Sequence, residues 1–183
     1  MAVSYLESLI ARIQDRDQWP DFDRPYFLDE LNGIADEAYE SNSVYGYLAA
    51  LLIYHQLTEE MLRLLLEYSE FFVQIELAPI EIHFPIPEKA MFGRLLEATK
   101  SSMEFENKTE LLSLAQVIYR GRIEFVHGLT KQEGTQEIGQ KVQQVKAHFE
   151  DFYGKFVEAQ DWFLLCFKDL RKDRDWDEML SGE

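Results

Sequence analysis

Two long stretches of the chain, residues 43–77 and 135–172, carry apolar side chains at alternating spacings of three and four residues. This spacing places those side chains along one side of an α-helix, whereas the faces of a β-strand alternate at every second residue. The stripe of the first stretch consists of Leu48, Leu51, Leu52, His55, Met61, Leu62, Leu65, Tyr68 and Phe72. The stripe of the second stretch consists of Val142, Val145, Phe149, Phe152, Phe156, Ala159, Phe163 and Phe167. Because such stripes have to be buried against other helices, the sequence predicts an all-α fold, an up-and-down antiparallel helical bundle.

The chain divides by pattern into three parts. Residues 1–42 form an irregular helical N-terminal lead-in, in which Pro25 is placed to begin a helix that ends near Gly33. Residues 43–172 form the helical bundle, and residues 173–183 form a charged C-terminal tail. The role of the lead-in stays open between capping the bundle and covering an interface.

Within the bundle, two more helices are expected between the long ones. The stretch APIEIHFPIPEK, residues 78–89, interrupts the helical pattern with three prolines and is expected to cross the bundle as a loop. Pro87 is placed to begin the next helix. A further helix is expected from a cap near Thr109 into the stretch YRGRIEFVHGL, residues 119–129.

The charge of the chain restricts its partners. The chain has 18 basic and 34 acidic residues, which gives a formal net charge of −16. Non-specific affinity for nucleic acids depends on basic side chains that displace counterions from phosphates, so we do not expect it here. An RNA substrate would have to be held by a few placed groups, and a basic protein partner fits the charge equally well.

Cysteine content and hydropathy indicate a cytoplasmic protein without a membrane span. Cys166 is the single cysteine, so an intrachain disulfide is excluded, as is usual in a reducing compartment. The longest apolar run, VYGYLAALLIYHQL, is shorter than the ~20 residues that a transmembrane helix needs.

Several common kinds of catalytic site are missing. The sequence has no Glu-x-x-His motif of di-iron bundles, no glycine-rich phosphate loop and no Gly-x-Ser-x-Gly nucleophile turn. His55 and Glu59 share a helix face at a spacing of four residues, but two groups alone are a weak metal signal, and a histidine at the edge of the core beside a surface acid is the favoured interpretation. We therefore expect no metal and no cofactor.

The stretch YRGRIEFVHGL is the strongest functional signal. In a continuous helix Arg122 falls on the same line as the apolar residues Leu111, Ala115 and Ile118. A charged side chain there has to be paired or has to face a cleft or a partner. Arg120 or Arg122 together with a neutral-pH acid–base group such as His127 would suit metal-free phosphoryl chemistry.

Helix register alone does not decide which arginine meets the histidine. Arg120 and His127 share a helix face, Arg122 and His127 do not, and a kink at Gly121 would change both relations. In a purely structural alternative, both arginines pair with nearby acids and His127 simply ends the helix.

The stretch RIEFVHGL resembles the Arg-x4-6-His motif of the HEPN superfamily, and the order of helices over residues 43–172 is similar as well. The resemblance implies a homodimeric helical bundle. Many such proteins are metal-independent endoribonucleases, often toxins or defence effectors that have an antitoxin or regulator as partner, with the active site at the dimer interface. It implies His127 as the acid–base residue and Arg122 as the phosphate clamp, with Tyr119 and Arg120 as supporting groups.

One departure from the motif keeps a second function open. Ile123 follows Arg122, where nuclease members usually carry Asn, Asp or His, and Glu124 and the acidic chain also disfavour a polyanionic substrate. The superfamily includes members without nuclease activity, such as the mannitol-operon regulator type. The alternative is therefore a non-catalytic helical dimer that acts as a regulatory or protein-interaction module.

Overall fold

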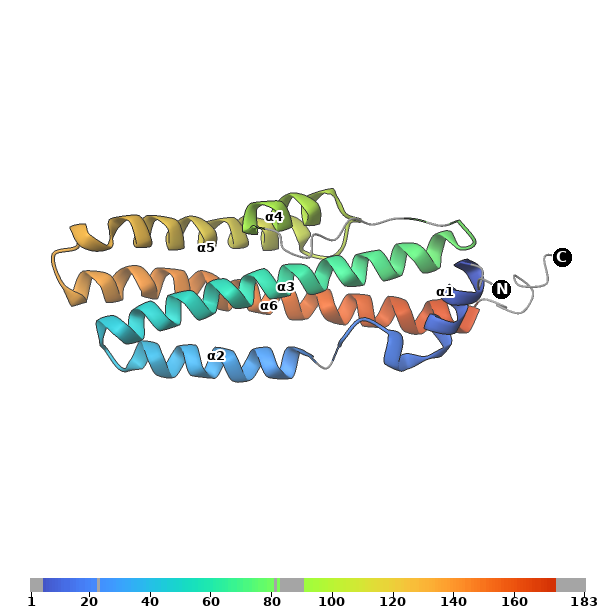
Figure 1. The fold of residues 1–183 in the computed structure, drawn as a ribbon, viewed down its shortest axis with the longest axis horizontal. Helices are drawn as coiled ribbons and strands as arrows, with labels where there is room; N and C mark the ends of the chain where they lie inside the picture. Colours follow the sequence, from blue (N-terminus) through green and yellow to red (C-terminus); the bar gives the residue numbers. More distant parts are fainter. Residues whose placement is uncertain (1–4, 23, 81, 83–90, 174–183) are drawn as a thin grey trace.

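A computed structural model describes residues 5–22, 24–80, 82 and 91–173. All regular elements of these residues are helices, as the sequence predicts. They are, in chain order, α1 (Tyr5–Gln14), the 3-10 turn η1 (Arg16–Gln18), α2 (Arg24–Glu40), α3 (Val44–Leu77), α4 (Phe92–Ser101), α5 (Lys108–Gly128), η2 (Leu129–Lys131) and α6 (Thr135–Asp173). The fold is an all-α helical bundle (Figure 1).

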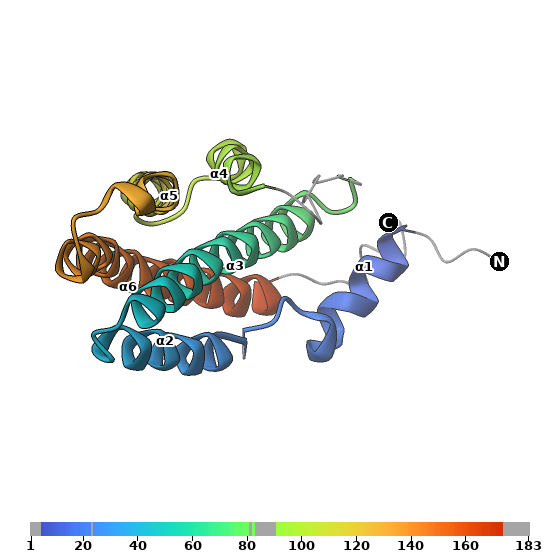
Figure 2. The same ribbon diagram turned by 60° about the vertical axis from the view of Figure 1, so that its left-hand side comes forward.

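The two longest helices, α3 and α6, form the centre of the bundle and pack against each other. Helix α2 packs along α3, and α5 packs along α6, each antiparallel to the long helix that follows it in the chain (Figure 1). Helix α4 is short and lies against α3 and α5, on the opposite side of α3 from α2 (Figure 2). Helices α4 and α5 therefore share one side of the molecule, and α2 lies alone on the other.

The apolar stripe of α6 is the principal contribution to the core. All eight of its residues are buried, and five of them are phenylalanines. Three of the five, Phe149, Phe163 and Phe167, lie against aromatic rings of α3, and Phe167 also meets rings of the N-terminal region. The ring of Phe167, for example, lies 5.2 Å from that of Phe71 and 5.6 Å from that of Phe22. The prediction that this stripe is core packing is confirmed. On α3 the prediction is wrong for Leu52, which lies on an outer edge of the bundle and is 49% exposed.

Helix α2 is longer than the sequence indicates. The predicted end near Gly33 is wrong, because the helix continues to Glu40. Contacts with the centre of the bundle explain the continuation. The hydroxyl of Tyr54 in α3 donates a 2.6 Å hydrogen bond to Asp36, which also forms an ion pair with Lys146 of α6. These bonds and the burial of Ala35 outweigh the cost of about 1 kcal/mol for a glycine inside a helix.

The turn between α2 and α3 requires a glycine. Ser43 caps α3, and its hydroxyl accepts a 3.0 Å hydrogen bond from the backbone N–H of Gly46. A Cβ atom at Gly46 would lie 2.1 Å from the carbonyl oxygen of Ala38 and 2.0 Å from the Ser41 hydroxyl. The close approach of the two helices at this point therefore excludes a side chain.

The remaining boundaries are close to those predicted. Helix α5 begins at Lys108, one residue before the expected cap, because Asn107 adopts a left-handed conformation (φ 61°) and ends the preceding turn. The predicted helix start at Pro87, most of the predicted loop over residues 78–89 and the tail beyond residue 173 lie outside the described residues. Among the helices that are described, none has an apolar segment long enough to span a membrane.

Candidate functional site

Helix α5 carries all four side chains that the sequence singles out, and it is unbroken from Lys108 to Gly128. Gly121 lies within it and does not interrupt it. Residues five apart in a regular helix lie about 140° apart around the axis and about 7.5 Å apart along it. Arg122 and His127 therefore leave α5 on different sides, whereas Arg120 and His127 share a side.

Arg122 lies on the inner side of α5, as expected from its register with the apolar stripe. Leu111, Ala115 and Ile118 on the same line are fully buried, and Arg122 itself is partly buried. Its Nε atom is buried and has no hydrogen-bond partner among the described residues. The guanidinium thus enters the region between α5 and α3.

Two titratable groups of α3 are close enough to respond to this charge. Burial lowers the pKa of His55 to about 4, and the positive charge of Arg122 contributes to that decrease. Burial raises the pKa of Glu59, and the charges of Arg122 and Arg63 oppose that rise. His55 is therefore neutral at pH 7, and the groups that the fold places near Arg122 are a neutral histidine and a partly buried carboxylate.

Aromatic rings close one side of this cluster. The rings of Phe92 in α4 and Tyr119 in α5 are stacked, with centroids 4.7 Å apart and an interplanar angle of 3°. The imidazole of His55 lies 5.0 Å from Phe92 and 6.0 Å from Tyr119. Its Nε2 atom is buried and has no hydrogen-bond partner in the described part of the chain. Tyr119 is thus part of a packing contact among three helices.

His55 and Glu59 are the residues near Arg122 that sequence reasoning did not connect with it. Their shared helix face is confirmed, although His55 Nδ1 and Glu59 Oε2 are 3.8 Å apart, too far for a hydrogen bond. The favoured interpretation, a histidine at the core beside an acid, describes their environment correctly, because His55 is buried and Glu59 is partly exposed. The available signal was Arg122 itself, since a cation within an apolar stripe indicates a carboxylate on the facing helix.

Arg120 and His127 lie on the outer side of α5 and are exposed. Arg120 lines a groove of 370 Å³ between α5 and α6, whose walls also include Lys141, Gln144 and His148. Lys141 is already paired with Glu137, at a distance of 3.0 Å. The groove is therefore lined by basic, acidic and neutral polar side chains, and Arg120 is the basic side chain that α5 contributes to it.

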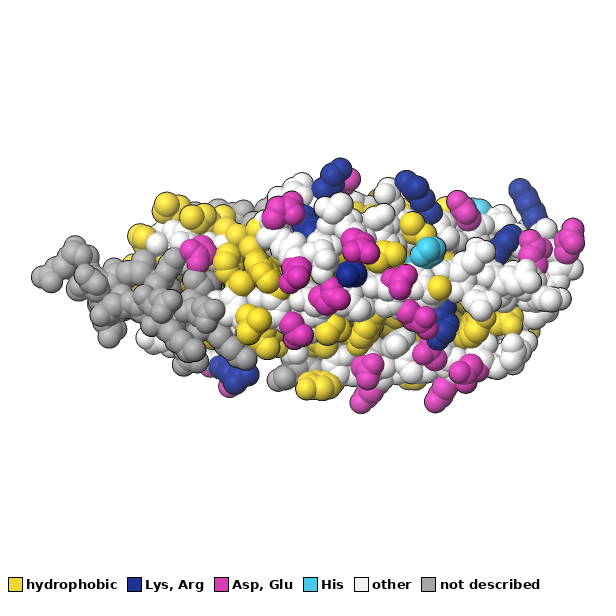
Figure 3. Space-filling view, turned by 180° about the vertical axis from the view of Figure 1, so that it is seen from behind, with side chains coloured by type: hydrophobic (Ala, Val, Ile, Leu, Met, Phe, Trp, Pro, Cys, Tyr) yellow, Lys and Arg dark blue, Asp and Glu magenta, His cyan; other side chains and the backbone are white. Residues whose placement is uncertain are grey.

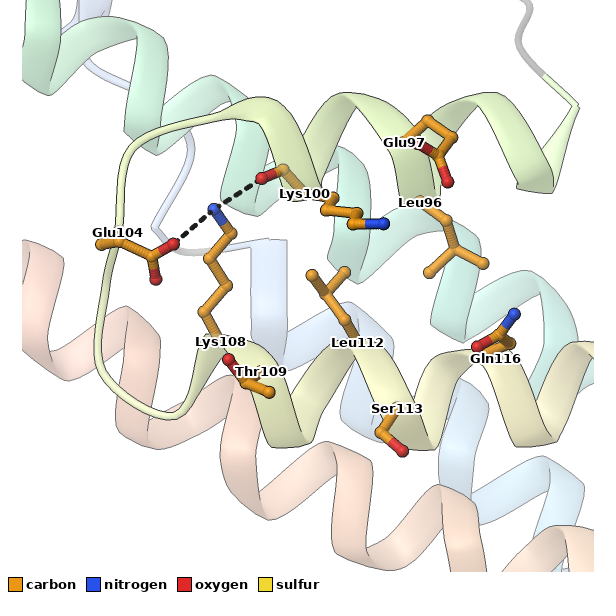
Figure 4. Close-up of a pocket in the computed structure, with 9 residues that line it drawn as sticks. All are labelled: Leu96, Glu97, Lys100, Glu104, Lys108, Thr109, Leu112, Ser113 and Gln116. Atoms are coloured by element: carbon orange, nitrogen blue, oxygen red, sulfur yellow. Dashed lines mark hydrogen bonds and ion pairs between the residues drawn. The ribbon is translucent and has the colours of Figure 1, made fainter.

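A larger pocket of 560 Å³ lies between α4 and α5 (Figure 4). The amino group of Lys108 points from α5 toward the end of α4 and donates a 3.0 Å hydrogen bond to the carbonyl oxygen of Lys100 (Figure 4). It donates a second hydrogen bond, of 2.9 Å, to the carbonyl oxygen of Ser102. This buried lysine therefore satisfies carbonyl groups that the end of a helix leaves free. The other lining residues are Leu96, Glu97, Glu104, Thr109, Leu112, Ser113 and Gln116.

No cluster that could hold a metal ion is present within the described ranges, where no three His, Cys, Asp or Glu side chains converge. Comparison of the chain with protein-family models, with curated proteins and with solved structures gives no match. The function therefore has to be inferred from the residues and their geometry.

Proposed function

We propose that this chain is a HEPN-like helical-bundle protein that acts as a regulatory or protein-interaction module and does not cleave RNA. The observation that carries the proposal is the direction of Arg122, which enters the bundle beside His55 and Glu59 and leaves α5 about 140° away from His127.

The helical order supports the HEPN-like part of the proposal. The long helix α3 is followed by the short α4, by α5 with the Arg-x4-His sequence in its last two turns, and by the long α6. This is the order that the resemblance implies for residues 43–172. A homodimer, which the resemblance also implies, is part of the proposal.

The chemistry of the motif residues supports the non-catalytic part. A phosphate clamp uses a guanidinium whose N–H groups point toward the substrate. Arg122 instead has a buried Nε and a carboxylate, Glu59, nearby, so its charge is partly compensated inside the bundle. Ile123 is partly buried and offers no polar group at the position next to the clamp.

A metal-independent endoribonuclease is the second candidate, because Arg120 and His127 share the exposed side of α5. In a homodimer two copies of this pair would be available, one from each protomer. Such an enzyme would be of the toxin or defence type, with a neutralising antitoxin as partner.

One experiment separates the two candidates. Purified protein is incubated with single-stranded RNA in EDTA, alongside Arg122→Ala, His127→Ala and Arg120→Ala, with Arg94→Ala, at an exposed arginine of α4, as the matched control outside the motif. Light scattering of each sample reports the oligomeric state. We expect no cleavage by any of these proteins.

Cleavage by the native protein that is lost in His127→Ala and in either Arg120→Ala or Arg122→Ala, but kept in Arg94→Ala, would refute the non-catalytic function and establish the nuclease. Cleavage that is equal in all samples would indicate a contaminating nuclease and leave the proposal standing.

A further inference from the structure

An unusual feature of the surface lies on α2, on the side of the bundle away from the motif. Its residues Phe27, Leu31, Ile34 and Ala38 follow one another at spacings of four, three and four, and they form one line on the helix. We call this line the α2 strip. Phe27 is 57% exposed and Ile34 is 52% exposed, while Leu31 and Ala38 are partly buried against the core.

The exposed edge of the α2 strip, Phe27 and Ile34, lies beside the stripe that holds α2 in the bundle. Leu28 and Ala35 are buried and face α3, about 100° around the helix from Phe27 and Ile34. Helix α2 lies on the outside of the molecule (Figures 1 and 2), and Phe27 and Ile34 of the strip are open to solvent. An isolated exposed leucine or phenylalanine needs no explanation, but a second apolar line over about three turns of one helix is the pattern by which helices pair.

The side of the strip next to solvent is acidic. Glu30 and Glu37 are exposed, lie beside the strip on the same helix, and form no ion pair with any described residue. Tyr26, 76% exposed, lies on the same side. The lower edge of Figure 3, where α2 runs, shows acidic and hydrophobic side chains next to one another.

This combination selects one kind of occupant. A second copy of the chain on the strip would bring the same carboxylates face to face, which costs free energy. Nucleic acids and anionic membranes are repelled by the same groups. A helix with an apolar stripe flanked by Lys or Arg matches both the apolar line and the two carboxylates.

We propose that the α2 strip binds a basic amphipathic helix of a partner protein, with Phe27 and Ile34 packed into the helix contact and Glu30 and Glu37 paired with its basic side chains. The inference rests on the proposed function as an interaction module, and it names the surface and the chemistry of the partner.

The test uses the full chain and three fluorescent synthetic helical peptides. The first has a leucine stripe flanked by lysines, the second has glutamates in place of those lysines, and the third has the composition of the first in an order without a helical stripe. Fluorescence anisotropy reports binding. We expect saturable one-to-one binding of the first peptide in the micromolar range and at least about tenfold weaker binding of the other two.

Two pairs of variants locate the binding site on the protein. The double variant Phe27→Ser/Ile34→Ser removes the apolar contact. Its control is Met91→Ser, which changes an exposed apolar residue just before α4. Glu30→Lys reverses a charge beside the strip, and Glu97→Lys reverses an exposed charge on α4. We expect each α2 change to weaken binding about tenfold and each control to leave it within about twofold.

The inference would be overturned if the first peptide did not bind. It would also be overturned if Glu30→Lys and Glu97→Lys weakened peptide binding equally, because binding would then depend on net charge alone. Concentration-dependent self-association that Phe27→Ser abolishes would also overturn it, in favour of a second copy. The RNA assay is independent of these results. Cleavage of RNA would refute the proposed function, and specific peptide binding on α2 could still be observed. Absence of peptide binding together with absence of RNA cleavage would refute this inference alone.

Discussion

The close contact of α2 with α3 at Gly46 leads to a quantitative prediction. In Gly46→Ala the new Cβ would lie 2.1 Å from the carbonyl oxygen of Ala38, whereas ordinary contacts begin at 3.4 Å. Backbone atoms would have to move by more than an ångström. Overpacking costs about 1–3 kcal/mol, and displacement of the Ser43 cap adds about 1 kcal/mol. We therefore expect Gly46→Ala to lower the free energy of unfolding by about 2–4 kcal/mol.

Two other glycines provide matched controls with the opposite sign. A Cβ added at Gly33 in α2 or at Gly154 in α6 would have no atom within 4 Å. Both glycines are inside helices, where alanine is favoured over glycine by about 1 kcal/mol. Gly33→Ala and Gly154→Ala are each expected to raise the free energy of unfolding by about 0.5–1 kcal/mol.

Urea denaturation followed by circular dichroism at 222 nm measures all three variants against the native protein. The midpoint should fall for Gly46→Ala and rise for the two controls, and thermal melting should show a decrease of about 10 °C for Gly46→Ala. A Gly46→Ala protein as stable as the native one would refute the reasoning, because α2 and α3 would then not approach as closely at this turn as the structure shows.

Three further changes test the interior. The pKa of about 4 for His55 lies below its unfolded value of 6.5, so between these pH values the unfolded chain binds more protons and the free energy of unfolding falls as the pH drops. His55→Leu should remove about 2–3 kcal/mol of that fall, measured by urea titrations at several pH values. His127→Leu, a change on the surface, should leave the fall in place. Lys108→Met should cost about 2–3 kcal/mol in chemical denaturation, because it leaves carbonyl groups without their donor, whereas the exposed Lys100→Met should change stability by less than about 0.5 kcal/mol. Tyr54→Phe should cost about 2 kcal/mol by thermal melting through loss of its hydrogen bond to a carboxylate; an unchanged melting temperature would contradict the observed contact.

Much of the fold could be predicted because the signals are local. The spacing of apolar residues in α3, α5 and α6 depends only on helix geometry, and the buried phenylalanines of α6 follow from it. The end predicted for α2 is too early because Gly33 is an unfavourable residue locally, while the contacts that offset it come from α3 and α6. The spacing of Leu52 predicts a core position, but its side chain is 49% exposed in the assembled bundle.

The candidate site shows the same division. The sequence places Arg122 in the apolar stripe of α5 and leaves open which group meets it. The assembled bundle decides that His55 and Glu59 lie within reach of its charge and that His127 lies on the outer side.

The sequence by itself therefore determined that the chain is helical, where α3, α5 and α6 lie, most of their apolar stripes and the acidic character of the chain, because each depends on residues within a few turns of one another. Only the tertiary structure decided which stripes meet, which charge Arg122 faces and that the α2 strip stays exposed. These depend on how far and at what angle helices distant in the sequence approach each other, and no local pattern contains that information.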